Sequence, residues 1–280
     1  MQDLRFLLRV SRPRFWIYVL GPYLIGVAAA ASGRSDFARL DTLIFGLYFL
    51  LPANLLIYGI NDIFDYETDS LNPKKDKYEV LVKPESHRKL RLWIALLNVP
   101  FITAAILLIP QALPPLAGFL FFSIYYSATP VRAKAVPFLD SIFNILYVFP
   151  GAFAYQMLTG SFPPIVVILA AGLWTMAMHA YSAIADIDAD KKAGMDTVAT
   201  ALGSTGTHMF CMACYLAAAV SAAAFAPALM LLGLVYLPLM LLSAGSKNRD
   251  GMFSIYRLFP MINSICGFLI FWYAAWPKFF

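Results

Sequence analysis

Acidic side chains gather at two places in this chain of 280 residues, and their spacing suits one kind of chemistry. The two groups are Asn61, Asp62, Asp65 and Asp69, and then Asp186 and Asp190. Side chains three or four residues apart share one face of a helix, where carboxylates repel one another unless a cation lies between them. Carboxylate oxygens suit Mg²⁺, which binds in proteins together with substrate phosphates. The spacing therefore predicts two helix faces that hold Mg²⁺ ions bridging a diphosphate.

Basic residues near the two groups are candidate partners for that diphosphate. Arg132 and Lys134 lie between the two groups, and Lys191 and Lys192 directly follow the second. When the bond to a diphosphate breaks, the leaving group gathers negative charge, which Mg²⁺, Lys and Arg stabilise. Asp188 would face away from Asp186 and Asp190 on a regular helix, so we place it outside the site.

Aromatic side chains are abundant enough to serve the other product of such a cleavage. Phe, Tyr and Trp make up 15% of the chain. An allylic cation left by the diphosphate can be stabilised by aromatic faces, which do not react with it as a base would. Most of these aromatics are expected to face lipid or to lie at the membrane interface. The candidates for a cation-binding wall are Tyr125, Tyr126, Tyr147, Tyr155, Trp174 and Tyr181.

The composition places these residues in an α-helical membrane protein. Hydrophobic residues make up 61% of the chain and charged residues only 13%, against about 25% in soluble domains. The mean hydropathy is +0.71. Apolar runs of about 20 residues can cross a bilayer as helices, and such continuous runs exclude the alternating strands of a β-barrel. We expect one domain over residues 1–280. Nine such runs occur in it: 15–32, 41–61, 90–110, 113–127, 136–158, 164–185, 206–225, 227–244 and 254–276.

Lys and Arg predict the orientation of these nine spans. With the N-terminus in the cytoplasm, 18 of the 21 Lys and Arg residues fall on the cytoplasmic side. Eleven of the 16 acidic residues lie in two cytoplasmic loops or the bordering helix ends. The loop after the second span carries seven of the basic residues, including Lys74, Lys75 and Lys77. Both acidic groups are therefore expected at the cytoplasmic side of an integral, multi-pass inner or plasma membrane protein.

Three further polar residues have two interpretations each. Asp140 lies inside the fifth span, where an ionisable group is a functional candidate, although a hydrogen-bonded structural carboxylate is the alternative. His179 precedes Asp186 and could line a substrate chamber or bond a neighbouring helix. Asp196 is predicted as the N-cap of a short helix that follows the second acidic group.

Several segments of the sequence resemble the UbiA superfamily of intramembrane prenyltransferases. GINDIFDYETDSLNPKK resembles the first Asp-rich motif of that family, NDxxDxxxD, and YSAIADIDADKKAGMDTVATALG resembles the second, DxxxD. YSATPVRAKAVPFLD resembles the segment between the fourth and fifth spans, and SRPRFWIY resembles the entry to the first. The resemblance covers nearly the whole chain, and both motifs occur in the right order.

The resemblance implies an all-α bundle of nine transmembrane helices around a central chamber with a cytoplasmic-side cap. It implies Mg²⁺ as cofactor, and an isoprenyl diphosphate and a lipophilic acceptor as substrates within the lipid bilayer. The metal and catalytic residues would be Asp62, Asp65, Asp69, Asp186 and Asp190, and the diphosphate-binding residues Asn61, Lys134 and Arg132. Arg132 has an alternative role as an anchor to anionic lipid headgroups.

Within the superfamily, NDIFDYETDSLNPKK and HAYSAIADIDADKKAG look most like the lycopene elongase branch. That branch adds a dimethylallyl unit to the end of a C40 polyene, and the product cation could be hydrated or deprotonated. An aromatic or quinone-precursor acceptor is the alternative within the superfamily. A divalent-cation transporter is a remote alternative, because transport sites usually lie near the bilayer midplane. The motif of CDP-alcohol phosphotransferases is absent from the sequence.

Other partners are not expected from the sequence. The pI of about 9.0 follows from the positively charged loops and does not indicate nucleic-acid binding. The sequence contains no Gly-rich phosphate loop or Rossmann fingerprint, so we expect no nucleotide cofactor. Nothing in the sequence indicates an obligate protein partner.

Overall fold

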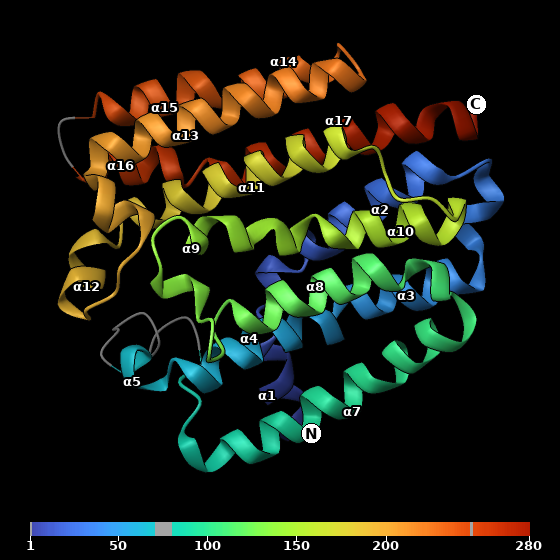
Figure 1. Cartoon of the computed structure of the whole chain (residues 1–280), viewed down its shortest axis with the longest axis horizontal. Helices are drawn as coiled ribbons and strands as arrows, with labels where there is room; N and C mark the ends of the chain where they lie inside the picture. Colours follow the sequence, from blue (N-terminus) through green and yellow to red (C-terminus); the bar gives the residue numbers. More distant parts are fainter. Residues whose placement is uncertain (1, 71–79, 247–248) are drawn as a thin grey trace. The chain divides into compact units, whose positions relative to one another are not determined.

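The computed structural model describes residues 2–70, 80–246 and 249–280, and all regular secondary structure within these ranges is helical (Figure 1). Lys74, Lys75 and Lys77, which contribute to the predicted orientation, lie outside the described residues. The chain divides into two compact units, each described here by itself. The first unit comprises 1–131, 149–162 and 271–280, and the second comprises 132–148 and 163–270. A single domain over 1–280 stays a prediction.

The first unit contains the helices that lead to and from the first acidic group. Its elements are α1 (Gln2–Val10), η1 (Pro13–Phe15), α2 (Ile17–Ala30), η2 (Arg34–Ala38), α3 (Leu40–Leu50), α4 (Pro52–Phe64), α5 (Tyr66–Asp69), α7 (Pro84–Leu108), η3 (Pro110–Ala112), α8 (Leu113–Tyr125) and α10 (Phe149–Thr159). Helices α2 and α10 lie side by side (Figure 1). A Cβ on Gly26 of α2 would lie 2.2 Å from the carbonyl oxygen of Gly151 on α10. Glycine is therefore required there, because small residues let membrane helices approach closely.

Aromatic rings fill the centre of the first unit. Phe45 of α3 lies 4.8 Å from Phe153 of α10, and Phe49 lies 5.5 Å from Phe119 of α8, between ring centroids. All four rings are buried. Edge-on and tilted aromatic pairs at such distances contribute about 0.5–1.5 kcal/mol each beyond the burial of their area. This core holds α3, α8 and α10 together.

The second unit contains the helices around the second acidic group. Its elements are η4 (Ala133–Ala135), α9 (Leu139–Ile142), η5 (Phe143–Tyr147), α11 (Ile165–Ile184), α12 (Ile187–Lys192), α13 (Val198–Phe225), α14 (Leu229–Leu234), α15 (Tyr236–Ala244), α16 (Arg249–Tyr256) and most of α17 (Phe259–Phe279). Helices α11 and α13 form the most extensive packing in this unit (Figure 1). Helix α13 is broken at Gly203, whose φ of 66° is in the left-handed region that favours glycine.

A buried polar chain lies in the core between these helices. Tyr181 of α11 donates a hydrogen bond to Ser243 Oγ at 2.9 Å, and His208 Nε2 lies 3.0 Å from the same oxygen. The Tyr181 ring packs on Phe259, with centroids 4.7 Å apart. The aromatic side chain of Tyr181 is therefore part of the helix core, which corrects its assignment as a candidate for the cation-binding wall.

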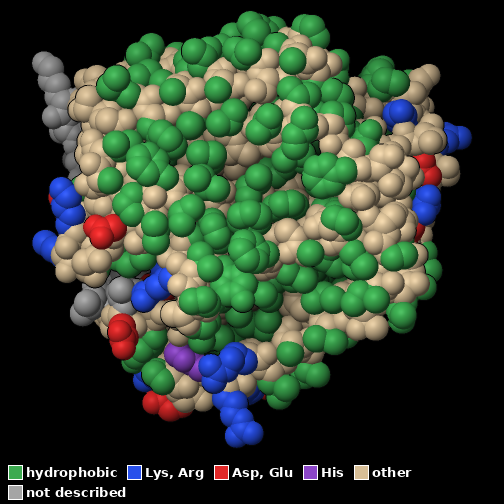
Figure 2. Space-filling view, in the orientation of Figure 1, with side chains coloured by type: hydrophobic (Ala, Val, Ile, Leu, Met, Phe, Trp, Pro, Cys, Tyr) green, Lys and Arg blue, Asp and Glu red, His purple; other side chains and the backbone are tan. Residues whose placement is uncertain are grey.

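Six helical segments of the described residues are long and apolar enough to cross a membrane: Leu40–Phe64, Pro84–Leu108, Leu139–Thr159, Ile165–Ile184, Val198–Phe225 and Gly251–Phe279. The other three predicted spans also contain helices, namely α2, α8 and the Leu229–Ala244 segment, but these are shorter. The structure therefore supports several spans and does not establish the number nine. Figure 2 shows hydrophobic side chains over most of one face, as contact with lipid requires, and Leu108 and Leu231 are 72% and 67% exposed.

Candidate functional site

The first acidic group forms two successive turns at the end of the Leu40–Phe64 segment. Helix α4 ends at Phe64, and the short helix α5 begins at Tyr66. Two backbone hydrogen bonds continue across the break: Asp65 N donates to Asn61 O at 3.0 Å, and Asp69 N donates to Asp65 O at 2.8 Å. Asn61, Asp65 and Asp69 therefore follow one another at a spacing of one turn.

The prediction that Asp62, Asp65 and Asp69 share one face of a continuous helix is wrong in one respect. Asp65 lies between the two helices, with φ −107° and ψ 5°. An unbroken helix would stack the three carboxylates on adjacent turns, where like charges destabilise it. The break lets Asp62 and Asp65 take different partners.

Asp62 is paired with an arginine from the start of the chain. The Nη2 atom of Arg12 donates a hydrogen bond to Asp62 Oδ1 at 2.8 Å, and the Asp62 side chain is only 3% exposed. The guanidinium also lies over the ring of Tyr58, 4.8 Å from its centroid. Tyr58 precedes Asp62 by one turn of α4, so one helix face presents both the carboxylate and the ring to the cation.

Asp65 is held by the neighbouring amide. Asn61 Nδ2 donates to Asp65 Oδ2 and also to Ser127 Oγ at 3.0 Å. Asp65 is 2% exposed. Asn61 thereby connects the first acidic group to the segment that follows α8, and its amide orients a buried carboxylate by a charge-assisted hydrogen bond.

The second acidic group forms one turn between α11 and α13. Asp186 directly precedes α12, and Asp190 N donates to Asp186 O at 2.8 Å. Asp186 and Asp190 are half-buried, whereas Asp188 is exposed. Asp188 thus lies on the other side of the turn, as its position between the two predicts.

The basic residues before α9 lie in a strained turn. Arg132 has φ 43° and ψ 53° in the left-handed region, and the 3₁₀ helix Ala133–Ala135 starts directly after it. Left-handed geometry costs a residue other than glycine about 1–2 kcal/mol. Lys134 in this helix is only 9% exposed.

The residue that caps α13 is Thr197, which corrects the prediction of Asp196. Thr197 Oγ1 accepts from Thr200 N at 3.2 Å, and Thr200 Oγ1 accepts from Thr197 N at 2.8 Å. This reciprocal pair is a capping box with Thr in place of the usual Glu or Gln. Asp196 and Thr197 are both of residue types that favour the N-cap, so the sequence alone did not decide between these two adjacent positions.

No three His, Cys, Asp or Glu side chains come together as a metal-binding group within residues 2–70, 80–246 and 249–280. Within the first group, Asp62 contacts Arg12 and Asp65 contacts Asn61. The donors are nevertheless carboxylate and amide oxygens, two of the carboxylates are buried, and both groups lie beside helix ends. This donor set fits Mg²⁺ in its chemistry.

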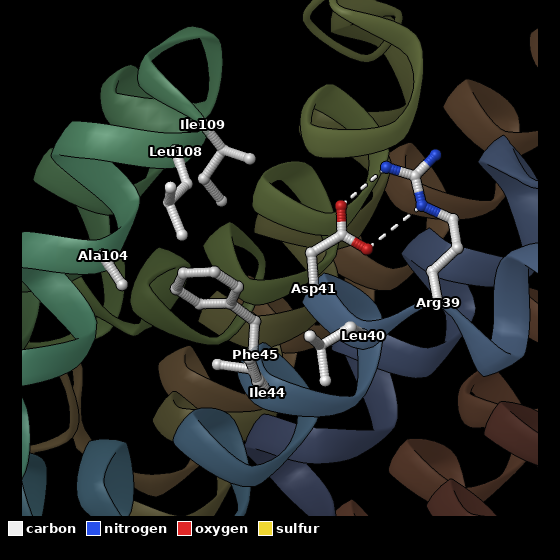
Figure 3. Close-up of a pocket in the computed structure, with 8 residues that line it drawn as sticks. All are labelled: Arg39, Leu40, Asp41, Ile44, Phe45, Ala104, Leu108 and Ile109. Carbon is white, nitrogen blue, oxygen red and sulfur yellow. Dashed lines mark hydrogen bonds and ion pairs between the residues drawn. The ribbon is translucent and has the colours of Figure 1, made fainter.

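A cavity of about 360 Å³ lies elsewhere in the first unit, at the start of α3 and the end of α7 (Figure 3). Arg39 Nη2 pairs with Asp41 Oδ2 at 2.6 Å on its wall. The other lining side chains are Leu40, Ile44, Phe45, Ala104, Leu108 and Ile109. The cavity adjoins the beginning of the Leu40–Phe64 segment, whereas the first acidic group follows its end, so this cavity is distinct from the candidate site.

Sequence reasoning missed Arg12 and Ser127 as contacts of the first acidic group. In the sequence, Arg12 contributes only to the count of positive charges. In the structure, it is hydrogen-bonded to Asp62, which lies 50 residues further along the chain. Its backbone lies in the left-handed region, with φ 51°. A single sequence carries no signal for such a long-range pair.

The Arg12–Asp62 pair is expected to couple the N-terminal segment to α4. Arg12→Met should lower the free energy of unfolding of the metal-free protein by about 1–3 kcal/mol, because it removes a donor from a buried carboxylate. The loss should be smaller in an Asp62→Asn background, with a coupling energy of about 0.5–3 kcal/mol. Reversible unfolding in mixed detergent micelles measures the free energy of unfolding of the wild type, the two single variants and the double variant.

Arg14→Met is the matched control for this cycle, because Arg14 is exposed and lies in the same segment. It should change the free energy of unfolding by less than about 0.5 kcal/mol. Equal losses from Arg12→Met with and without Asp62→Asn would show that the pair contributes nothing.

Comparison with known proteins places the chain in a family. The profile described as "UbiA prenyltransferase family" matches residues 19–250. The chain is 42% identical over 273 residues to a protein of Haloferax volcanii named "Lycopene elongase/hydratase", covering 97% of this chain and 89% of that protein. A protein of the same name from Halobacterium salinarum is 38% identical over 264 residues, with 94% of each chain covered.

Solved structures agree in fold. A UbiA homolog from Archaeoglobus fulgidus bound to GPP and Mg²⁺ superposes with a TM-score of 0.72 at 20% identity, covering 95% of this chain and 99% of that one. A digeranylgeranylglyceryl phosphate synthase also gives a TM-score of 0.72, at 17% identity and with 98% and 99% covered. The profile, the relatives and the fold agree over nearly the whole chain, and the chain therefore belongs to the UbiA prenyltransferase family, as a multi-pass membrane enzyme that groups with its lycopene elongase branch.

Proposed function

We propose that the protein transfers a dimethylallyl group from dimethylallyl diphosphate to a carotenoid such as lycopene. The type of reaction is supported by two acidic turns beside apolar helices. Backbone hydrogen bonds link Asn61, Asp65 and Asp69 in the first turn and Asp186 and Asp190 in the second. Relatives named for lycopene elongation that match almost the full chain support the choice of a carotenoid as acceptor.

The residue roles follow from the donor types at each turn. Asp62, Asp65, Asp69, Asp186 and Asp190 would hold Mg²⁺, and Asn61, Lys134 and Arg132 would bind the diphosphate. When bound, Mg²⁺ supplies positive charge that neutralises the departing diphosphate. The fit rests on oxygen-only donors and on a UbiA homolog solved with GPP and Mg²⁺.

The chain's own residues then act on the diphosphate and on the cation that it leaves. Breaking the C–O bond puts further negative charge on the diphosphate, which the Lys134 ammonium and the Arg132 guanidinium stabilise. The bond electrons leave with the diphosphate, so an allylic cation remains in the apolar interior. A terminal double bond of the acceptor supplies the electron pair for the new C–C bond. The resulting cation becomes neutral either by losing a proton or by adding water and losing a proton from the added water.

We also propose that the N-terminus and both acidic groups face the cytoplasm. The asymmetric distribution of Lys and Arg supports this orientation, because positively charged loops stay on the cytoplasmic side. The cytoplasm would also be the side from which a water-soluble diphosphate arrives.

An aromatic or quinone-precursor acceptor is the second candidate, and it changes only the acceptor. A divalent-cation transporter is less well supported, because both acidic groups lie at the ends of helices, whereas transport sites usually lie near the bilayer midplane. Flux of Mg²⁺ into proteoliposomes would favour the transporter.

The proposal is tested by release of diphosphate from dimethylallyl diphosphate by the purified protein in lipid nanodiscs. Release should require both lycopene and Mg²⁺, and a chelator should abolish it. Release with 4-hydroxybenzoate and not with lycopene would support the aromatic acceptor instead. Release that persists in a chelator would contradict the assignment of the acidic groups.

A further inference from the structure

Asp140 is a fully buried carboxylate that the proposed reaction does not use. It lies in α9, and its exposure is 0%. Burial of a carboxylate is costly unless hydrogen bonds or opposite charges compensate for the lost water. The contacts of this side chain therefore indicate what it does.

Two elements approach the same oxygen of Asp140. The backbone N–H of Val198, the first residue of α13, donates to Asp140 Oδ2 at 3.0 Å. His179 Nε2 of α11 lies 3.7 Å from that oxygen. All three residues belong to the second unit. The second acidic group lies between His179 and Val198 in sequence, so Asp140 contacts the chain on both sides of it.

Hydrogen bonds fix the chain both at the start of α13 and directly after Asp190. At the start of α13, the Thr200 amide donates to Thr197 Oγ1 within the capping box, and the Val198 amide donates to Asp140 Oδ2. Helix α12 ends at Lys192, and Gly194, two residues further on, has a φ of 66°. Gly194 N donates to Lys191 O at 3.2 Å, and Met195 N donates to Asp190 O at 2.9 Å. These two bonds form a Schellman motif, which fixes the path of the chain after Asp190.

The other flank leads to Asp186 through the last turns of α11. His179 lies on α11, which ends at Ile184. Asp186 N then donates to Ala183 O at 3.0 Å. The position of His179 against Asp140 thereby sets where α11 delivers Asp186.

Asp140 is also connected to Lys134 by consecutive turns. Val136 N donates to Ala133 O, and Asp140 N donates to Val136 O, both at 3.0 Å. Lys134 lies within the first of these turns. A shift of Asp140 would therefore move the Lys134 turn relative to the second acidic group.

We propose that Asp140 is a positioning residue that fixes the Asp186–Asp190 turn relative to Lys134, through its hydrogen bond to Val198 and its contact with His179. This inference rests on the proposed function, in which Asp186 and Asp190 bind the metal and Lys134 binds the diphosphate. Residues that orient such ligands commonly change metal affinity or activity by about 10- to 100-fold when they are replaced.

The kinetic test compares Asp140→Leu with Asp140→Asn. Asp140→Leu should raise the half-saturating Mg²⁺ concentration and the KM for dimethylallyl diphosphate by about 10- to 100-fold, with the KM for the acceptor unchanged. Asp140→Asn should recover most of this loss, because its amide oxygen can still accept from Val198 N. Unchanged donor and Mg²⁺ constants in Asp140→Leu, or no recovery in Asp140→Asn, would overturn the inference.

A second test uses the metal-free protein and needs no activity. Hydrogen–deuterium exchange of a peptide covering residues 193–203 should be about fivefold faster or more in Asp140→Leu than in the wild type. Thr175→Val is the matched control, because Thr175 is buried in the same unit and bonds only Gly172 O within its own helix. Equal protection in Asp140→Leu and Thr175→Val would overturn the inference.

Val198→Pro covers the case in which Asp140→Leu does not fold. It deletes the donor and keeps the carboxylate, and proline is well accepted at the first position of a helix. It should raise the same donor and Mg²⁺ constants in the same direction, and unchanged constants would overturn the inference.

Asp190→Asn distinguishes failure of this inference from failure of the proposed function. If it weakens Mg²⁺ and donor binding while Asp140→Leu does not, the inference fails and the proposed function stands. If it leaves both constants unchanged, the proposed function fails, and exchange in the metal-free protein still decides whether Asp140 anchors the turn.

Discussion

Asp65→Asn and Asp190→Asn are each expected to lower kcat/KM for prenyl transfer by about 100-fold or more. Each change keeps the shape of the side chain and removes one negative charge from a proposed Mg²⁺ ligand. Loss of one electrostatic contact to the transition state typically costs about 10²–10³ in rate. The two residues belong to different compact units, so parallel losses would show that both acidic turns serve one reaction.

Asp188→Asn is the matched control for these variants. Asp188 lies in the same turn as Asp190 but is exposed, and we place it outside the site. Steady-state assays with varied Mg²⁺ and donor should find it within about threefold of the wild type. An equal loss in Asp188→Asn and Asp190→Asn would mean that general negative charge matters, and not ligation by specific carboxylates.

Lys134→Met should lower kcat/KM for the diphosphate donor by about 100-fold. Lys134 is largely buried, and the proposed function uses its ammonium against the charge that develops on the leaving diphosphate. Lys134→Arg should fall between the wild type and Lys134→Met, because it keeps the charge but changes its geometry. The measurement is the initial rate at varied donor concentration with saturating acceptor.

Arg257→Met is the control for the loss of one positive charge in the same unit. Its guanidinium is exposed and lies over Phe253, 5.3 Å from the ring centroid. It should leave the donor kinetics unchanged. If Lys134→Met changed only the KM for the acceptor, Lys134 would not be a diphosphate ligand.

The sequence predicted the class of fold because lipid imposes strong rules on it. Apolar runs of sufficient length can only be helices in a bilayer, and helices occur in all nine predicted segments. The number of spans was harder to predict, because helices such as α2, with 14 residues, are shorter than the apolar runs that contain them.

The sequence also predicted the acidic groups, since they depend on local spacing. The turns at Asn61–Asp65 and Asp186–Asp190 have the one-turn spacing expected. Neither the break at Asp65 nor the partners from elsewhere in the chain were predicted, because local spacing carries no information on tertiary contacts. Arg12 is one such partner, and its pairing with Asp62 is a tertiary contact.

Asp140 shows how structure resolves an ambiguous residue. From the sequence it was either a functional carboxylate or a structural one. Its hydrogen bond to Val198 shows that it has a structural contact, and its contacts on both sides of the second acidic group are the basis of the proposed positioning role.

The most direct measurement of the central claim is the mass of the carotenoid formed from lycopene and ¹³C-labelled dimethylallyl diphosphate. The purified protein with Mg²⁺ should yield a carotenoid heavier than lycopene by one or two labelled C5 units, and Asp190→Asn should yield almost none. Label that enters an aromatic acceptor and never a carotenoid would contradict the proposed function.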